Sequence, residues 1–261
     1  MARLAGAVHL WLTSLTWGRV AGIVALIFVV EAGTFGYFYF ARRSPVAVVG
    51  SRIPEPRPAP PAYLYSIYGP WDAALVKPMA VWVAGKRIYV TDTGNQRVQV
   101  FDYDGRPLFR FGEYGDGPGH FRFPYGVAVD AAGEIYVADL YNGAVSVFGP
   151  DGEFRRYLGE GAPEDDTVVA PAGLFVTGDR VYVTDVGKHT VMAFSRDGEK
   201  LLEFGGRGRG LGQLDSPNAV TVAGDRVYVV DTGNDRVQVF DREGGFTMAF
   251  DGSPDGKGPP V

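Results

Sequence analysis

The sequence lacks cysteine and is poor in histidine. Because none of the 261 residues is cysteine, disulfides, zinc–thiolate sites and cysteine nucleophiles are excluded. Only three histidines occur, His9, His120 and His189, which are too few for a metal centre that gathers several histidines. The chain also lacks a G-x-S-x-G sequence, the local signature of a serine nucleophile on a sharp turn. These absences favour a protein without catalytic residues, and we expect no cofactor and no metal.

The chain also lacks an excess of basic side chains. Its formal net charge is −5, and from residue 62 onward it carries 19 lysines and arginines against 28 aspartates and glutamates. Nucleic-acid phosphates are bound by positively charged surfaces. We therefore expect no nucleic-acid partner.

One long apolar run is present near the N-terminus. Residues 20–40 follow a short N-terminal region, 1–19, and as a helix they would extend about 31 Å, enough to cross a bilayer core. Arg19 precedes the run, and Arg42 and Arg43 follow it. The sequence predicts a single transmembrane helix at residues 20–40. A cleaved signal peptide is the alternative interpretation.

A carboxylate lies near the middle of this apolar run. Glu31 would cost on the order of 2.5–3.5 kcal/mol if it stayed ionised and unpartnered in the bilayer. Ala32 and Gly36 have the small-residue spacing that lets two helices approach closely. We expect Glu31, Ala32 and Gly36 to contact another membrane helix; a protonated, tolerated Glu31 is the alternative.

The segment after the apolar run, residues 41–62, is rich in proline and predicts a semi-rigid stalk. A stalk that carries a long C-terminal domain favours an extracytoplasmic position for that domain. The arginines that follow the helix favour the opposite orientation by the positive-inside rule. We expect a single-pass membrane protein with its large domain on the extracytoplasmic side.

The rest of the chain is a repeat. A stretch at residues 87–102 returns almost unchanged at residues 226–241, with two looser copies between them. The aspartates Asp92, Asp139, Asp185 and Asp231 mark the repeats, at steps of 47, 46 and 46 residues. Each repeat predicts four short strands that alternate apolar and polar residues. Four-stranded units at this period are typical of β-propeller blades.

The Asp-x-x-Asn-x-Arg-Val-Gln-Val-Phe pattern at residues 92–101 and 231–240 resembles the NHL repeat. The glycine-rich segments 115–121 and 208–214 resemble it as well, and the resemblance covers residues 63–252, followed by a tail at 253–261. Repeats two and three depart from the pattern in the turn after the aspartate. The predicted fold is all-β: a β-propeller of four-stranded NHL-type blades with four visible repeats, preceded by the transmembrane helix.

The resemblance implies about six blades, which would need roughly 276 residues at this period. Only 200 residues follow from Ala62, with four repeats and one spare strand expected at residues 63–68. Two interpretations are open. Either four blades close by themselves, or the array is open and a partner, such as a second copy, completes it.

The recurring aspartates have two interpretations. They could surround a calcium ion, since carboxylates are calcium ligands. Their fixed place in each repeat instead favours a role in the turn, where each side chain accepts hydrogen bonds from backbone amides. We expect the turn role for the aspartates, and loop positions for His120 and His189.

Residues that differ between the repeats are free to serve recognition. Exposed aromatic side chains in loops on a rigid scaffold suit protein interfaces, although each could equally pack beneath a neighbouring loop. The candidate partner-binding residues are Trp71, Tyr114, His120, Phe121, Tyr125, Tyr141, Lys188 and His189.

The predicted function is a non-catalytic protein-binding scaffold or accessory subunit of a larger membrane-associated complex. One alternative, implied by the resemblance, is a propeller-type lyase or lactonase that uses a metal. A second alternative is a ligand sensor at the cell surface.

Overall fold

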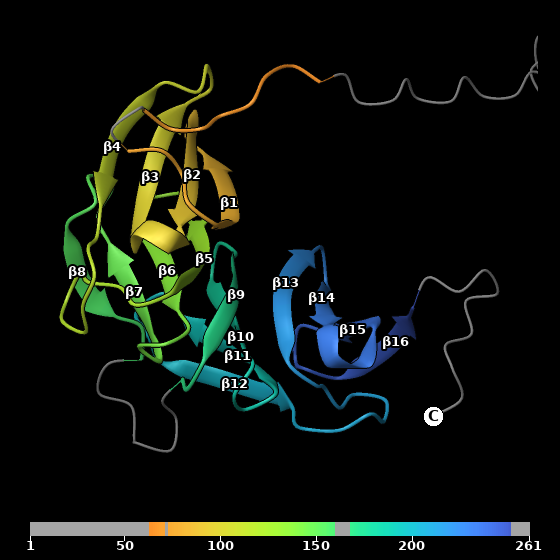
Figure 1. Ribbon diagram of the computed structural model, residues 1–261. Helices are drawn as coiled ribbons and strands as arrows, with labels where there is room; N and C mark the ends of the chain where they lie inside the picture. Colours follow the sequence, from red (N-terminus) through yellow and green to blue (C-terminus); the bar gives the residue numbers. More distant parts are fainter. Residues whose placement is uncertain (1–62, 71–72, 160–167, 252–261) are drawn as a thin grey trace, which may run out of the picture. The chain divides into compact units, whose positions relative to one another are not determined.

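The computed structural model describes residues 63–70, 73–159 and 168–251. The chain divides into two units, residues 1–65 and 66–261, and the described strands all belong to the second (Figure 1). The described residues contain no helix long and apolar enough to cross a membrane. Residues 20–40 lie outside the described ranges, as do Glu31, Ala32 and Gly36, so the membrane helix and its contacts stay predictions.

The described strands form four separate four-stranded antiparallel sheets, as the repeats predict. We call these sheets blades 1 to 4 in chain order. The bounds are β1 Pro78–Ala84, β2 Arg87–Asp92, β3 Arg97–Asp102 and β4 Pro107–Phe111; β5 Pro124–Val129, β6 Ile135–Asp139, β7 Ala144–Phe148 and β8 Phe154–Tyr157; β9 Pro171–Val176, β10 Arg180–Asp185, β11 Thr190–Ser195 and β12 Lys200–Gly205; β13 Pro217–Ala223, β14 Arg226–Asp231, β15 Arg236–Asp241 and β16 Phe246–Phe250.

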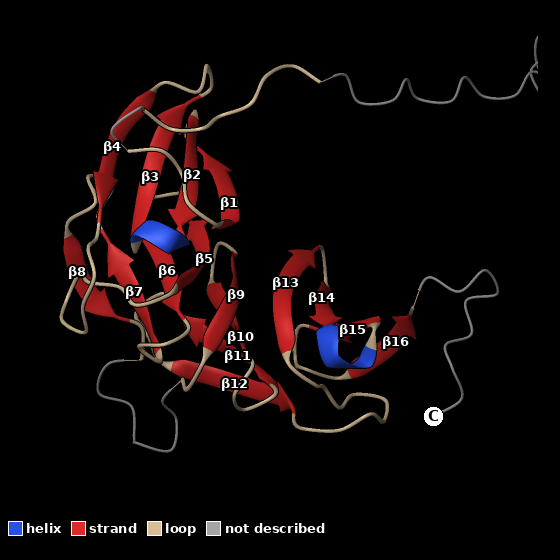
Figure 2. Ribbon diagram, in the orientation of Figure 1, coloured by secondary structure: helices blue, strands red, loops and turns tan. Residues whose placement is uncertain are grey.

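Each blade is a simple meander, in which consecutive strands are neighbours. Strands dominate, and the only helical elements among the described residues are the short 3-10 turns η1, Thr93–Asn95, and η3, Thr232–Asn234 (Figure 2). Each of these turns follows the repeat aspartate and ends on a residue in the left-handed region, Gln96 or Asp235. The near-identical motif thus gives the same local structure in blades 1 and 4.

Consecutive blades pack face to face through apolar side chains. The first strands make the contacts, β1 with β5, β5 with β9, and β9 with β13. Three apolar clusters lie at these junctions, one between each pair of consecutive blades. Among the described residues, extensive contacts between strands occur only within a blade or between consecutive blades.

The spare strand predicted at residues 63–68 is not formed. Residues Tyr63–Tyr68 are irregular, and the segment that follows makes backbone bonds to a turn rather than to a sheet edge, such as that from the Gly94 amide to the Val76 carbonyl, 2.8 Å. The alternating aromatic pattern there predicted a strand, but the structure provides no neighbouring strand with which it pairs.

Candidate functional site

Two sets of loops meet at one end of each blade. Because consecutive strands run antiparallel, the connection that enters a blade lies at the same end as the turn between its second and third strands. Hydrogen bonds join the two sets: Asn142 donates to the Gly115 carbonyl and Asn234 to the Gly208 carbonyl, both at 2.9 Å. We call this end, with its entering connections and its second-to-third strand turns, the loop end.

The repeat aspartates organise the loop end, and blades 1 and 4 use side chains to hold them. Asp92 is buried and accepts from Arg97 Nε at 2.7 Å, and from the side-chain amides of Asn95 and Gln99 at 2.8 Å each. It also accepts from the Val76 amide, at 2.6 Å. The carboxylate therefore ties the turn, the third strand and the entering connection together.

Asp231 has the same partners in blade 4. Arg236 Nε donates to it at 2.7 Å, Gln238 at 3.0 Å and the Asp215 amide at 2.6 Å. Spacings of three, five and seven residues from the aspartate thus bring an amide, a guanidinium and a second amide to one carboxylate. The sequence displayed this pattern, but its role as one hydrogen-bonded group becomes evident only in the structure.

Blades 2 and 3 hold the aspartate with backbone amides alone. Asp139 accepts from the amides of Tyr141 and Asn142, both at 3.2 Å. Asp185 accepts from the amides of Gly187 and Lys188, both at 2.9 Å. The predicted turn role of the aspartates is confirmed in these two blades.

Both histidines of the loop end are also engaged. His120 Nε2 lies 3.2 Å from Glu113 Oε1, and His189 Nδ1 accepts from the Ser216 amide at 3.0 Å. His120 belongs to the connection between blades 1 and 2, whereas His189 belongs to the blade 3 turn. Within the described ranges, no group of three or more histidine, aspartate or glutamate side chains is arranged to hold a metal ion.

Tyr114 and Tyr141 are the exposed aromatic candidates. Their side chains are 69% and 63% accessible, respectively. The Tyr141 ring packs 4.7 Å from Phe123, and Tyr125, which is half-buried, lies 6.4 Å from the same Phe123 ring. The structure therefore brings Tyr125 and Tyr141 together through Phe123, a residue that the sequence analysis did not single out. Its position between two candidate aromatics was the only available signal.

The other candidates lie in different surroundings. Phe121 is fully buried, with its ring 5.6 Å from Phe148 in the junction between blades 1 and 2, so it offers no surface to a partner. Its equivalent in blade 4, Leu214, is buried in the same way. Lys188 is half-buried in the blade 3 turn. Trp71 lies outside the described residues.

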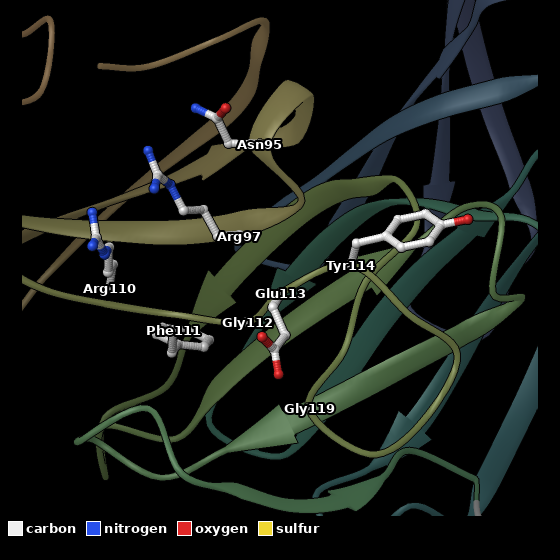
Figure 3. Close-up of a pocket in the computed structure, with 8 residues that line it drawn as sticks. All are labelled: Asn95, Arg97, Arg110, Phe111, Gly112, Glu113, Tyr114 and Gly119. Atoms are coloured by element: carbon white, nitrogen blue, oxygen red, sulfur yellow. The ribbon is translucent and has the colours of Figure 1, made fainter. Parts of the chain in front are cut away.

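A pocket of about 470 Å³ lies beside the Tyr114 connection (Figure 3). Its lining comprises Asn95, Arg97, Arg110, Phe111, Gly112, Glu113, Tyr114 and Gly119. Figure 3 shows the Arg97 and Arg110 side chains extending in the same direction, and Glu113 and Tyr114 in others. Arg97 is paired with Asp92, whereas Arg110 is exposed and has no ion-pair partner among the described residues. The pocket thus presents one available positive charge, and an exposed tyrosine lines it as well.

Two family models match the chain. A model described as a 6-bladed beta-propeller matches residues 72–158, which contain blades 1 and 2. The model of the NHL repeat matches residues 214–240, in blade 4. The chain contains an NHL repeat. These matches support the predicted NHL-type propeller with four-stranded blades.

Curated relatives match over short segments. They include an E3 ubiquitin-protein ligase TRIM71 from Rattus norvegicus, 46% identical over 52 residues, and the protein brain tumor from Drosophila melanogaster, 39% identical over 62 residues. An E3 ubiquitin-protein ligase NHLRC1 from Rattus norvegicus is 31% identical over 98 residues. These segments cover 20%, 24% and 37% of this chain, but only 6%, 6% and 24% of the relatives.

Solved structures share the fold. A catalytically inactive virginiamycin B lyase from Staphylococcus aureus with quinupristin superposes with a TM-score of 0.53 at 15% identity, over 69% of this chain and 57% of that chain. A nidogen/laminin complex superposes with a TM-score of 0.52 at 23% identity, over 68% of this chain and 66% of that chain. At identities this low, the superpositions show a shared propeller architecture and say nothing about activity.

Proposed function

We propose that this chain is a membrane-anchored, non-catalytic protein-binding module whose partner docks on the loop end of blades 1 and 2. Residues 20–40 would be the anchor, with the propeller on the extracytoplasmic side. The surrounding complex would include another membrane helix at Glu31, Ala32 and Gly36. The sequence relatives support the protein-binding role in general terms. Their ligase activity is not transferred, because the chain matches a minor part of each relative.

The observation that carries this proposal is the pair of exposed tyrosines on a fixed loop end. Tyr141 follows Asp139, whose carboxylate holds the turn by two backbone hydrogen bonds, and its ring rests on Phe123. The Tyr114 connection is tied to the same turn through Asn142 and Gly115. Large aromatic side chains held in place lose little conformational entropy on binding, which is why they often anchor interfaces.

The pocket beside Tyr114 adds a polar determinant. Arg110 is exposed there and can form a bidentate pair with a carboxylate of the partner. We therefore expect the partner to present an acidic side chain near an apolar one. Lysine in place of Arg110 would keep the charge but lose the paired geometry.

Site-specific photo-crosslinking of the full chain in its membrane tests the proposal. A benzophenone amino acid replaces Tyr114 or Tyr141, and a matched control replaces Tyr103, which is 50% accessible at the opposite end of blade 1. The expected result is an adduct of one defined mass from positions 114 and 141 and none from position 103. Adding Arg110→Glu reduces the adduct from position 114 by about tenfold, because a carboxylate replaces the cation.

Adducts of equal yield from Tyr103 would overturn the proposal, as would the absence of an adduct from both loop-end positions. An adduct that contains only two copies of this chain would also overturn it, because it would assign the loop end to self-association. Mass spectrometry of the purified adduct distinguishes these outcomes.

A further inference from the structure

No described residues of this chain cover one apolar face of each terminal blade. In blade 1 the uncovered face carries Met79, Val81 and Val83, of which Val81 is 62% and Val83 is 55% accessible. We call it the entry face, because in later blades the same face receives the preceding blade. In blade 4 the uncovered face carries Tyr228, Val230, Met248 and Phe250; we call it the exit face.

The entry face is a junction surface on which no described blade packs. The β5 residues Val127 and Val129 occupy the same positions relative to the strand's first proline as Val81 and Val83 in β1. Val127 and Val129 are 3% and 5% accessible, because they pack against blade 1 in the shared cluster. The same side-chain types are therefore buried at an inner junction and exposed in blade 1.

The exit face shows the complementary pattern. Tyr182 in blade 3 is fully buried, and its equivalent Tyr228 in blade 4 is only half-buried. Met248 and Phe250 are about 40% accessible, at 43% and 40%. Their strand-pair equivalents in blade 3, Leu202 and Phe204, pack against the blade 4 cluster. Blade 4 thus presents the surface on which a following blade would pack.

Polar contacts at the end of the blades opposite the loop end also join consecutive blades. At the junction of blades 3 and 4, Arg180 Nη2 lies 3.2 Å from Glu243 Oε1, and Arg242 Nη2 lies 2.6 Å from Asp179 Oδ1. Both contacts join the first hairpin of one blade to the last hairpin of the next. At the junction of blades 1 and 2, Arg87 donates to the Pro150 carbonyl at 2.9 Å, between the same two hairpins.

The terminal hairpins carry matching charges. Arg226 in blade 4 is the equivalent of Arg180, is exposed, and has no ion-pair partner among the described residues. Asp104 in blade 1 occupies the turn position of Glu243; it pairs with Arg106 of its own hairpin at 3.0 Å, and its side chain is 71% accessible. If an exit face packed on an entry face, Arg226 would lie next to Asp104. This contact would repeat the pairing of Arg180 with Glu243.

We propose that a second copy of this chain covers both faces, with blade 4 of each copy packed on blade 1 of the other. Two four-bladed chains related by a two-fold axis would form a closed ring of eight blades, within the range of known propellers. A second copy supplies both an entry face and an exit face. An unrelated partner would need one surface that resembles each of them. This interface lies on blade faces, so it is distinct from the loop end.

Cysteine cross-linking of the full chain in mild detergent tests the ring, because the parent chain has no thiol of its own. A Cβ on Gly173 would lie 2.7 Å from Ala219 Cα, so first strands approach closely at an inner junction. At the new junction Ala219 takes the place of Gly173, and Met79 takes the place of Asn218, whose carbonyl oxygen would lie 2.8 Å from the same Cβ. Differently tagged chains that carry Ala219→Cys and Met79→Cys are mixed and oxidised, with Leu201→Cys, 45% accessible on β12, as the control partner.

The expected product is a disulfide-linked heterodimer of the Ala219→Cys and Met79→Cys chains, at least about tenfold more abundant than with the Leu201→Cys chain. A chain that carries both substitutions should give dimers linked at both junctions and nothing larger. A link within one copy would overturn the proposal, because four blades would then close alone. A ladder of larger products, or no product above the control, would overturn it as well.

Charge reversal tests the contact independently of cross-linking. Arg226→Asp and Asp104→Arg should each raise the dimer dissociation constant by about tenfold, since each ring contains the contact twice. The two substitutions together should restore the parent value within about threefold. Arg209→Asp, the same charge change on an exposed connection, is the control. Equal effects of Arg226→Asp and Arg209→Asp would refute the pairing.

Discussion

Among the residues that the structure describes, blades 2 and 3 are covered on both faces, whereas blades 1 and 4 are covered on one. The difference is visible in their first strands: β5 is almost wholly buried, and β1 has no fully buried residue. Yet the sequence motif is strongest in blades 1 and 4. The most regular repeats are therefore the least covered ones.

The hydrogen bonds of the repeat aspartates differ between the same two pairs of blades. In blade 1, Arg97 and Gln99 bond both to Asp92 and to the Ala73 carbonyl, at 3.0 and 2.6 Å, so the blade holds its own entering connection. Blades 2 and 3 lack these side chains and pack against neighbours on both sides. A blade with one neighbour thus carries side chains around its aspartate, whereas in a blade with two neighbours the aspartate holds the entering connection through backbone amides only, those of Arg122 and Phe123 in blade 2 and of Val169 and Ala170 in blade 3.

Removal of the buried aspartates should give the largest difference between the two kinds of blade. Asp92→Ala should lower the free energy of unfolding by about 3–5 kcal/mol, because it leaves the largely buried Arg97 without its counter-ion. Asp139→Ala should cost about 1–3 kcal/mol, because it removes an acceptor from backbone amides only. Urea unfolding of the full chain measures both. Equal losses would show that the side-chain network adds nothing to blade 1.

A crowding substitution should separate an inner junction from the exit face. Gly126→Val should destabilise by about 3 kcal/mol, since its Cβ would collide with the Ala172 carbonyl oxygen of the next blade. Ala219→Val, at the same position of blade 4, should change the unfolding free energy of the dissociated chain by less than about 0.5 kcal/mol. A comparable loss at Ala219 would mean that blade 4 already has a neighbour there.

Most of the fold followed from the sequence because the repeat fixes it several times over. Prolines 78, 124, 171 and 217 each begin the first strand of a blade, and four strands follow in every repeat. The segment at 63–68 has the alternation of a strand but no partner, and local pattern cannot report whether a partner exists. Pairing is a property of the whole chain.

The candidate site was less accessible to prediction. Phe121 and Tyr114 both stand in a glycine-rich connection, and their sequence context does not distinguish a buried ring from an exposed one. The structure distinguishes them. A parallel bridge joins Tyr114 and Phe121, and the Phe121 ring faces the core whereas the Tyr114 ring faces solvent. Exposure depends on blade-to-blade packing, which the sequence of one repeat does not contain.

A milder truncation compares the entry face with an inner junction. Val129→Ala should cost about 2 kcal/mol, from the lost burial of its methyl groups and the cavity left behind. Val83→Ala should change stability by less than about 0.5 kcal/mol in the dissociated chain. At concentrations where two copies associate, Val83→Ala should weaken the dimer. No effect on either quantity would show that the entry face stays in solvent.

The smallest expected effect is electrostatic and depends on pH. The hydrogen bond from Arg242 holds the pKa of the Asp179 carboxyl below its usual range. The unfolded chain therefore takes up this proton first as the pH falls, so the pair's contribution is complete above the ordinary pKa of about 4 and disappears through the lowered one.

Asp179→Asn should accordingly reduce stability at pH 7 by roughly 0.5 kcal/mol or less, because the carboxyl is largely exposed, and by nothing once the pH is below the lowered pKa. Asp225→Asn, the equivalent change on the exit face, should have no effect on the dissociated chain at either pH, since among the described residues Asp225 has no ion-pair partner. Urea unfolding as a function of pH measures both variants. A deficit of Asp179→Asn that grew in acid would contradict the assigned pair, whereas an equal deficit of Asp225→Asn at pH 7 would mean that the exit face already meets a blade.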